Sequence, residues 1–153
     1  MNQLWVSNRQ KQRPINVRLL RRVLQAALHD LPGPGRYQLA LHLIGPRTSA
    51  QLNQTFLGHE GPTDVITFPH DAGRGEISGE IFICVAEAVR QAVQFQTTWT
   101  SELVRYAVHG MLHLLGHDDK EKRARHEMKR LENRILRRLG SLFPLAELGT
   151  RRT

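Results

Sequence analysis

The sequence predicts an α/β (α+β) fold, in which a single small mixed sheet is packed with about five helices. Segments with the apolar periodicity of helices alternate along the chain with short β-rich runs. The length of 153 residues fits one domain with a substantial core. The hydrophobic content of 40% is that of a soluble globular protein. These observations together favour a small globular domain with both kinds of secondary structure.

The first elements of the chain are a strand, a helix and a second strand. A short strand is expected at residues 4–6, before a helix at residues 15–31 in which apolar residues recur at helical spacing. The Pro-Gly-Pro-Gly run at residues 32–35 ends that helix. Alternating leucines then predict a strand at residues 38–44.

The next element is predicted from a capping box, in which Thr48 and Gln51 open a helix that ends near residue 56. Two strands and three helices are expected after it, at residues 64–68, 80–85, 86–95, 100–116 and 120–139. The predicted boundaries are a single domain at residues 1–140 and a loose C-terminal tail at residues 141–153.

Composition narrows the class of function. Lys and Arg outnumber Asp and Glu by 22 to 14, and the resulting net charge of +8 favours a polyanionic partner such as nucleic acid. Simple solubility is the alternative explanation of this charge. Cys84 is the only cysteine, so no intrachain disulfide forms, and an inert core thiol in a reducing cytosol is expected. No apolar leader or membrane-spanning run is visible, so we expect a cytoplasmic protein without membrane contact.

The most informative residues lie at the end of the helix expected at residues 100–116. His109 and His113 are four residues apart, so their rings lie one turn apart on one helix face and can bind one metal ion. Gly116 is expected to end the helix in a left-handed turn and to bring a third ligand toward the histidines. Three protein ligands with an open fourth position are typical of catalytic zinc. The motif therefore indicates a metal-dependent hydrolase.

The rest of this helix is consistent with a site. On a helical wheel Glu102, Arg105, His109 and His113 form one narrow polar strip on an otherwise apolar helix. Such a strip faces either solvent or a functional site. The glycine turn and the acidic residues that follow it favour a site.

Asp119 is the favoured third ligand, and His117 is the alternative. Asp119 lies ten residues after His109, which is the offset of the third ligand in the metzincin proteases. A carboxylate oxygen is an ordinary zinc donor. His117 would continue the polar strip only if the helix continued past Gly116.

This metal motif and three other segments resemble the YbeY family of bacterial endoribonucleases. The other segments are Leu52-Asn53, the Pro-Thr-Asp-Val element at residues 62–69 and the Ser-Gly-Glu element at residues 78–83. The similarity runs from about residue 39 to residue 119, in the order and spacing of the family. Members of this family are single-domain metalloproteins implicated in ribosomal RNA maturation.

The resemblance implies a small α/β metallohydrolase domain in which a helix and the following turn supply zinc ligands at His109, His113 and Asp119. The expected cofactor is one Zn²⁺ per chain, with another divalent transition metal as the alternative. The implied activity is hydrolysis of phosphodiester bonds in single-stranded RNA, in ribosomal RNA maturation and ribosome quality control. The implied partners are ribosomal RNA and ribosomal proteins.

Two positions depart from the family pattern. The third ligand is usually a histidine and is Asp119 here, and its negative charge is expected to weaken the effect of the metal on bound water. The arginine that the family uses in RNA cleavage falls on Leu57. Arg105, on the polar strip, is the candidate to replace it. Glu80, in the Ser-Gly-Glu element, is a second candidate catalytic residue.

Two other functions are open at this point. A zinc protease usually carries a glutamate general base directly after the first histidine, and that position is Gly110 here. A non-enzymatic ribosome-assembly factor would use the metal only to hold its fold, and Leu57 leaves room for this alternative. RNA cleavage measured with and without metal distinguishes these functions.

Overall fold

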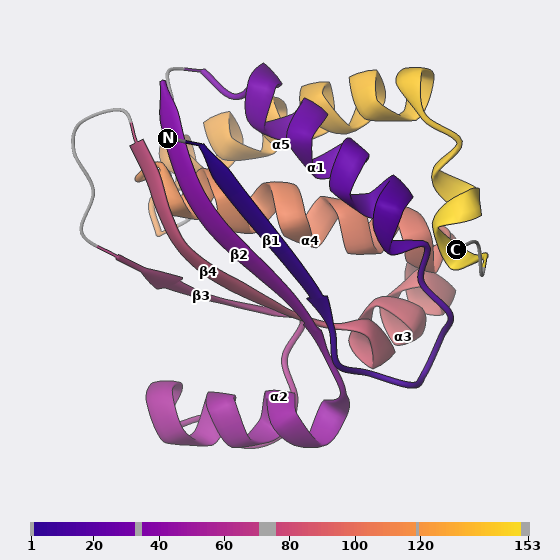
Figure 1. The fold of residues 1–153 in the computed structure, drawn as a ribbon. Helices are drawn as coiled ribbons and strands as arrows, with labels where there is room; N and C mark the ends of the chain where they lie inside the picture. Colours follow the sequence, from indigo (N-terminus) through magenta and orange to yellow (C-terminus); the bar gives the residue numbers. More distant parts are fainter. Residues whose placement is uncertain (1, 33–34, 71–75, 119, 151–153) are drawn as a thin grey trace.

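A computed structural model describes residues 2–32, 35–70, 76–118 and 120–150. Its centre is a four-stranded sheet in the order β1 (Gln3–Asn8), β2 (Arg36–Ile44), β4 (Glu76–Cys84) and β3 (Val65–Pro69) (Figure 1). The first three of these strands are parallel, and β3 pairs antiparallel with β4. The predicted small mixed sheet is therefore confirmed.

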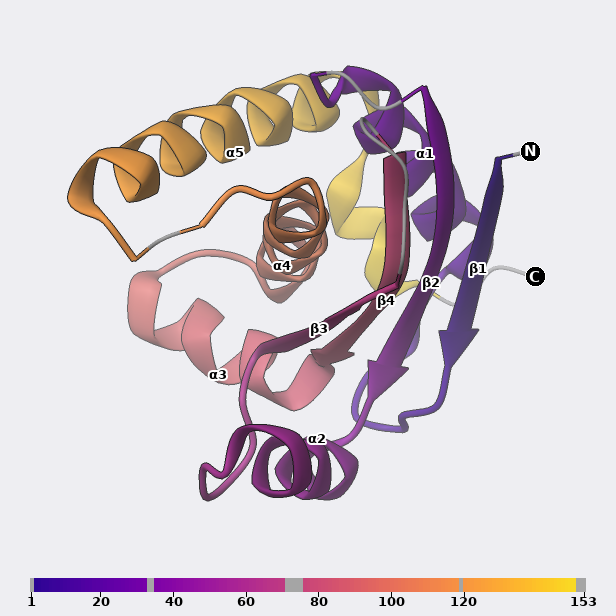
Figure 2. The same cartoon turned by 90° about the vertical axis from the view of Figure 1, so that its left-hand side faces the viewer.

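Five α-helices accompany the sheet in the described part of the chain. They are α1 (Val17–Asp30), α2 (Pro46–Leu52), α3 (Val85–Phe95), α4 (Trp99–Leu114) and α5 (Lys122–Leu142). Helices α1, α4 and α5 lie together on one side of the sheet, and α2 lies beyond the ends of the strands (Figures 1 and 2). None of the helices in the described ranges is long and apolar enough to cross a membrane.

One hydrophobic core joins the sheet to these helices. Ile77, Ile81 and Ile83 alternate along β4 with half-buried residues, so the core-facing side of this strand is fully buried. Helix α4 approaches β4 closely, because a Cβ added to Gly110 would lie 3.0 Å from side-chain atoms of Ile81. Glu80 follows the opposite phase of the strand and lies on the face away from α4.

The predicted helices and strands all form, but several boundaries differ. Strand β4 begins at Glu76, four residues before its predicted start. The capping box at Thr48 is wrong, because α2 already begins at Pro46 with Gly45 as its N-cap, and Thr48 lies inside the helix. Proline at the first helical position has no N–H to satisfy and starts the helix earlier. The helical path then continues as a π-helical turn, η1 (Asn53–Leu57), and so ends within one residue of the predicted end near residue 56.

The loose tail expected at residues 141–153 is also wrong for its described part. Helix α5 continues to Leu142, and a 3₁₀ turn, η2 (Leu145–Gly149), follows it. Leu148 is fully buried in the core, and its carbonyl accepts a hydrogen bond of 2.8 Å from the backbone N–H of Asn16. One buried leucine therefore anchors this segment beside α1. Residues 151–153 lie outside the described residues.

Candidate metal centre

The polar strip of α4 lines a cavity. Glu102 is buried, and Arg105, His109 and His113 are half-buried. Glu102, Arg105 and His109 line a cavity of about 520 Å³ together with side chains from α3, α5 and the start of β3. In this structure the strip therefore faces a partly open cavity between helices, with both polar and apolar side chains in its lining, which is suited to a site.

The two histidines point their Nε2 atoms at one another. These atoms are 3.1 Å apart, and the two rings are inclined at 74°. Two nitrogens that each lie about 2.0–2.1 Å from a tetrahedral zinc ion would be separated by roughly 3.3 Å. The observed separation is close to this value, so the pair has the geometry of two ligands to one metal ion.

Glu132 of α5 fixes the orientation of His109. Its Oε2 atom lies 3.1 Å from Nδ1 of His109. When Nδ1–H donates to this carboxylate, the lone pair of the imidazole is on Nε2, which faces His113. A carboxylate behind a histidine ligand is the usual support of zinc sites, because it fixes the tautomer and raises the basicity of the ring.

Glu132 is itself held as an anion inside the protein. Only 5% of the residue is exposed. Burial alone would raise the pKa of Glu132, but hydrogen bonds from His109 and Arg105 outweigh burial, and its pKa is lowered from the ordinary value. The carboxylate is therefore charged at neutral pH and able to accept the His109 proton.

The sequence analysis missed Glu132, although a signal for it exists. It occupies a position on the buried stripe of α5 that also contains Met128, Ile135 and Leu139. A carboxylate on an apolar stripe is rarely buried without a partner. Such a residue should therefore have been paired with the polar strip of the neighbouring helix.

Arg105 lies on the polar strip one turn before His109 and contacts the same carboxylate. Its Nη1 atom donates to Oε1 of Glu132 at 2.8 Å and to Oδ1 of Asn133 at 3.0 Å. The guanidinium thus connects α4 to α5 and lines the cavity. Both contacts use only the Nη1 atom of the guanidinium, so its other N–H groups are not engaged by them. The catalytic role of Arg105 stays a prediction.

Helix α4 ends in a left-handed turn at Gly116, as the sequence predicts. Gly116 has φ +101°, the N–H of Gly116 donates to the carbonyl of His113, and the N–H of His117 donates to the carbonyl of Leu112, each at 3.0 Å. This pair of bonds is a Schellman motif, which reverses the chain after a helix. The turn therefore removes His117 from the polar strip.

The contacts above concern two of the three predicted ligands. Asp119 lies outside the described residues. Within the described ranges, no group of three or more His, Cys, Asp or Glu side chains is arranged to hold a metal ion, and His117 stays the alternative ligand. Asp119 stays the predicted third donor.

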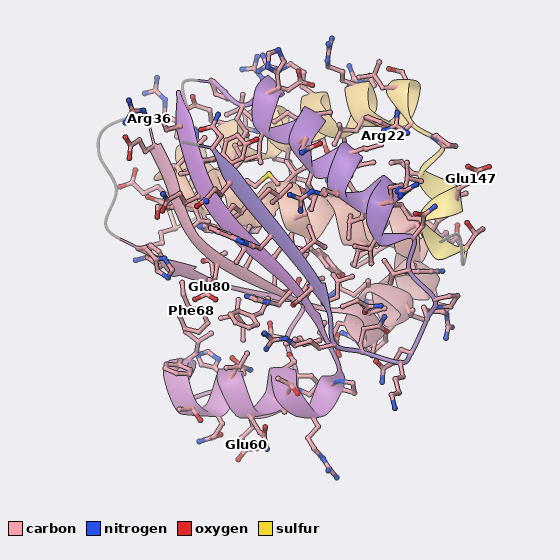
Figure 3. The ribbon with its side chains drawn as sticks, in the orientation of Figure 1. Arg22, Arg36, Glu60, Phe68, Glu80 and Glu147 are labelled. Atoms are coloured by element: carbon pink, nitrogen blue, oxygen red, sulfur yellow. The ribbon has the colours of Figure 1, made fainter. Side chains whose placement is uncertain are left out.

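Glu80 lies apart from the histidine pair. It projects from the face of β4 away from α4, beside its cross-strand neighbour Phe68 (Figure 3). There its two carboxylate oxygens lie 3.1 Å from Nε2 of His42 and 3.4 Å from Nε2 of His70. No described contact links Glu80 to the histidines of α4, and its catalytic role stays a prediction without structural support.

Leu57 is the last residue of η1, and its side chain is 52% exposed. Its aliphatic side chain offers no group that binds phosphate. The departure from the family arginine is therefore not compensated at this position.

Comparison with known proteins identifies the family of the chain. The family model described as "Endoribonuclease YbeY" matches residues 5–140. "Endoribonuclease YbeY" of Chlorobium phaeovibrioides is 40% identical over 97 residues, which are 63% of this chain and 65% of that protein. "Endoribonuclease YbeY" of Chlorobium luteolum is 34% identical over 139 residues, which are 90% of this chain and 98% of that protein.

A solved structure supports the same fold. The solution structure of TM1509 from Thermotoga maritima superposes with a TM-score of 0.62 at 23% identity, over 99% of this chain and 100% of that one. This structural similarity is evidence for the fold alone. Because the family model matches most of this chain, the chain belongs to the Endoribonuclease YbeY family.

Proposed function

We propose that this protein is a metal-dependent endoribonuclease that hydrolyses phosphodiester bonds of ribosomal RNA. The observation that carries the proposal is the convergence of His109 Nε2 and His113 Nε2, supported by the buried Glu132, in a member of an endoribonuclease family. Metal dependence is a general property of that family. Ribosomal proteins as further partners and a cytoplasmic location are parts of the same proposal.

Zinc is the metal that this donor set favours. Imidazole nitrogens from His109 and His113, with a carboxylate oxygen from Asp119, are ordinary zinc ligands. Another divalent transition metal is the alternative, because two imidazoles and one carboxylate also suit iron, for example. When bound, the ion supplies Lewis acidity toward a phosphate oxygen or a water molecule.

The residues of the chain have separate tasks in this proposal. Glu132 holds His109 in the tautomer that leaves Nε2 unprotonated, and Arg105 holds Glu132 in place. The cavity beside them is the space for the RNA strand, and its rim carries Arg125 and Lys129 from α5. These cations attract phosphate groups toward the histidines.

Gly110 disfavours protease chemistry on physical grounds. A zincin needs the carboxylate of glutamate at this position as general base. Here the position packs against Ile81, whose side-chain atoms lie 3.0 Å from an added Cβ, so any larger residue would require Ile81 to shift. The site therefore lacks the protease base at this position.

The test is cleavage of ribosomal RNA fragments by purified protein that has been depleted of metal and then reloaded with zinc. We expect cleavage only in the reloaded sample, and none from a His109→Ala/His113→Ala variant handled in parallel. Cleavage of equal rate in the depleted sample, or by the double variant, would contradict the proposal. A folded, zinc-loaded protein that binds but never cuts RNA would instead favour an assembly factor.

A further inference from the structure

Helix α5 concentrates positive charge on its exposed side. The helix contains eight Lys and Arg residues between Lys122 and Arg138, and all eight are exposed. Glu127 is its one exposed acid, because Glu132 is buried. The net charge of the whole chain is +8. Most of that excess therefore lies on one surface, formed by the exposed Lys and Arg residues from Lys122 to Arg138, which we call the basic face of α5.

The protein itself does little to neutralise this charge. Of the cations on the basic face, only Arg138 has an ion pair among the described residues, with Asp30 at 2.8 Å. Arg130 and Arg134 are spaced four apart, as are Arg134 and Arg138. Like charges at this spacing repel one another and destabilise a helix. A bound polyanion would remove this repulsion.

The basic face is continuous with the candidate metal centre. Arg125 and Lys129 belong to the basic face and also line the cavity that contains His109. Arg130, Arg134 and Arg137 lie farther around the helix, on the side opposite its buried stripe. Positive charge thus extends from the outside of α5 to the rim of the cavity.

The chemistry of this face matches a hydrophilic polyanion better than a membrane. A basic helix that inserts into a membrane keeps an apolar face for the lipid. In α5 that apolar face is already used, because Met128, Ile135 and Leu139 are buried in the core. Attraction between phosphates and guanidinium groups needs no apolar contact.

We propose that the basic face of α5 binds the phosphate backbone of the RNA substrate and guides the strand into the cavity that contains His109. This inference rests on the proposed function for the identity of the polyanion. The contacts are to phosphate, so they provide affinity and orientation without sequence preference.

The test compares two variants that lose the same charge. One is Arg130→Gln/Arg134→Gln/Arg137→Gln, and its matched control is Arg18→Gln/Arg21→Gln/Arg36→Gln, which changes three exposed arginines outside α5. Both are made in the His109→Ala/His113→Ala background, so that the RNA is not cut during binding. Affinity for a short, labelled single-stranded RNA is measured by fluorescence anisotropy over a range of salt concentrations, and circular dichroism verifies folding.

We expect the α5 variant to lose affinity for RNA by on the order of 10–100-fold at about 0.1 M salt. The slope of log affinity against log salt concentration should become less steep by about 2, because each of three lost phosphate contacts in a single strand contributes about 0.7. The control should stay within about threefold of the parent. An Arg→Lys triple variant at the α5 positions should retain binding, since it keeps the charge. With His109 and His113 intact, the α5 variant should raise KM and leave kcat within about twofold.

Equal losses in the two triple variants would overturn the proposal, since net charge alone would then explain binding. Unchanged binding by a folded α5 variant would overturn it as well, even if the wild type cleaves RNA and the proposed function stands. Binding to vesicles of phosphatidylglycerol in preference to RNA would also overturn it. Loss of binding in the α5 variant alone supports the proposal even if the wild type shows no cleavage, in which case the proposed function fails.

Discussion

Histidines contact a carboxylate on both sides of β4, but the two groups differ in the direction of their ring nitrogens. On the side of α4, Nε2 of His109 and Nε2 of His113 lie 3.1 Å apart, and Glu132 contacts the remaining nitrogen of His109. On the other side, Nε2 of His42 and Nε2 of His70 both point at Glu80. In the first group the two nitrogens face one another, and in the second group they both face the carboxylate.

The difference follows from the backbone that carries each group. An α-helix places residues four apart on one face, so two histidine rings can share a ligand without any loop to position them. His42 is a strand residue, and both of its nitrogens are engaged, since Nδ1 also lies 2.8 Å from Oγ of Ser7. The same residue types therefore form a candidate metal site on the helix and a hydrogen-bonded group on the sheet.

The largest expected effect comes from removing each histidine pair. His109→Ala/His113→Ala should reduce the bound metal from one equivalent to near background, because two of three protein donors are lost. The matched variant His42→Ala/His70→Ala should retain its metal. Metal analysis of both purified proteins measures the difference. Loss of metal from the His42→Ala/His70→Ala variant, with metal retained by the His109→Ala/His113→Ala variant, would contradict the assignment of the metal site to α4.

Exchanging each carboxylate for its amide sharpens the comparison. Glu132→Gln should weaken zinc binding by about 10–100-fold, the usual effect of losing the carboxylate behind a histidine ligand. Glu80→Gln should leave zinc affinity unchanged, because Glu80 contacts neither His109 nor His113 in any described interaction. Competition with a chromogenic chelator gives both affinities. Equal affinities in the two variants would show that Glu132 is only a structural link between α4 and α5.

The turn after α4 should matter for the first group alone. Gly116 has φ +101°, so Gly116→Ala should cost about 1 kcal/mol or more of unfolding free energy and also weaken metal binding by displacing Asp119. Gly140→Ala is a suitable control. Gly140 lies inside α5 with no atom within 4 Å of an added Cβ, and alanine there should be neutral or stabilising.

Chemical denaturation with and without zinc separates the two effects at Gly116. The predicted result is a smaller stabilisation by zinc in Gly116→Ala than in Gly140→Ala. A wild-type response to zinc in Gly116→Ala would mean that the turn does not position a ligand.

The smallest effect is expected at Cys84, a soft potential ligand that belongs to neither group. It is fully buried, and burial raises the pKa of its thiol above the ordinary value of 9.0, so at neutral pH it stays protonated. Its reaction with a thiol reagent should therefore be slow until the protein is unfolded. Cys84→Ala should keep its full metal content, whereas loss of metal would add a thiolate to the ligand set.

Much of the fold was predictable because its signals are local. The apolar periodicity of α1 and α4, the alternation in β2 and the glycine at the end of α4 each depend on neighbouring residues only. The boundary errors arose where a local rule met a competing one. Pro46 started α2 before Thr48 could cap it, and the buried side chain of Leu148 holds in place a tail segment that was expected to be loose.

The site was only partly predictable because its support is not local. The pair His109 and His113 follows from one helix, whereas the contact with Glu132 joins residues 23 positions apart on two helices. Glu80 illustrates the opposite case. Its segment matches the family motif, but the pleat of β4 directs its side chain away from α4, and no motif encodes that direction.

X-ray absorption spectroscopy of the zinc-loaded protein tests the central claim most directly, because it reports the ligands of the metal itself. The account predicts two imidazole nitrogens and one or two oxygens at about 2.0–2.1 Å, without sulfur. In Asp119→His the spectrum should show three imidazoles at unchanged metal content. A spectrum of the wild type with no imidazole scattering, or one left unchanged by removal of His109 and His113, would contradict the account.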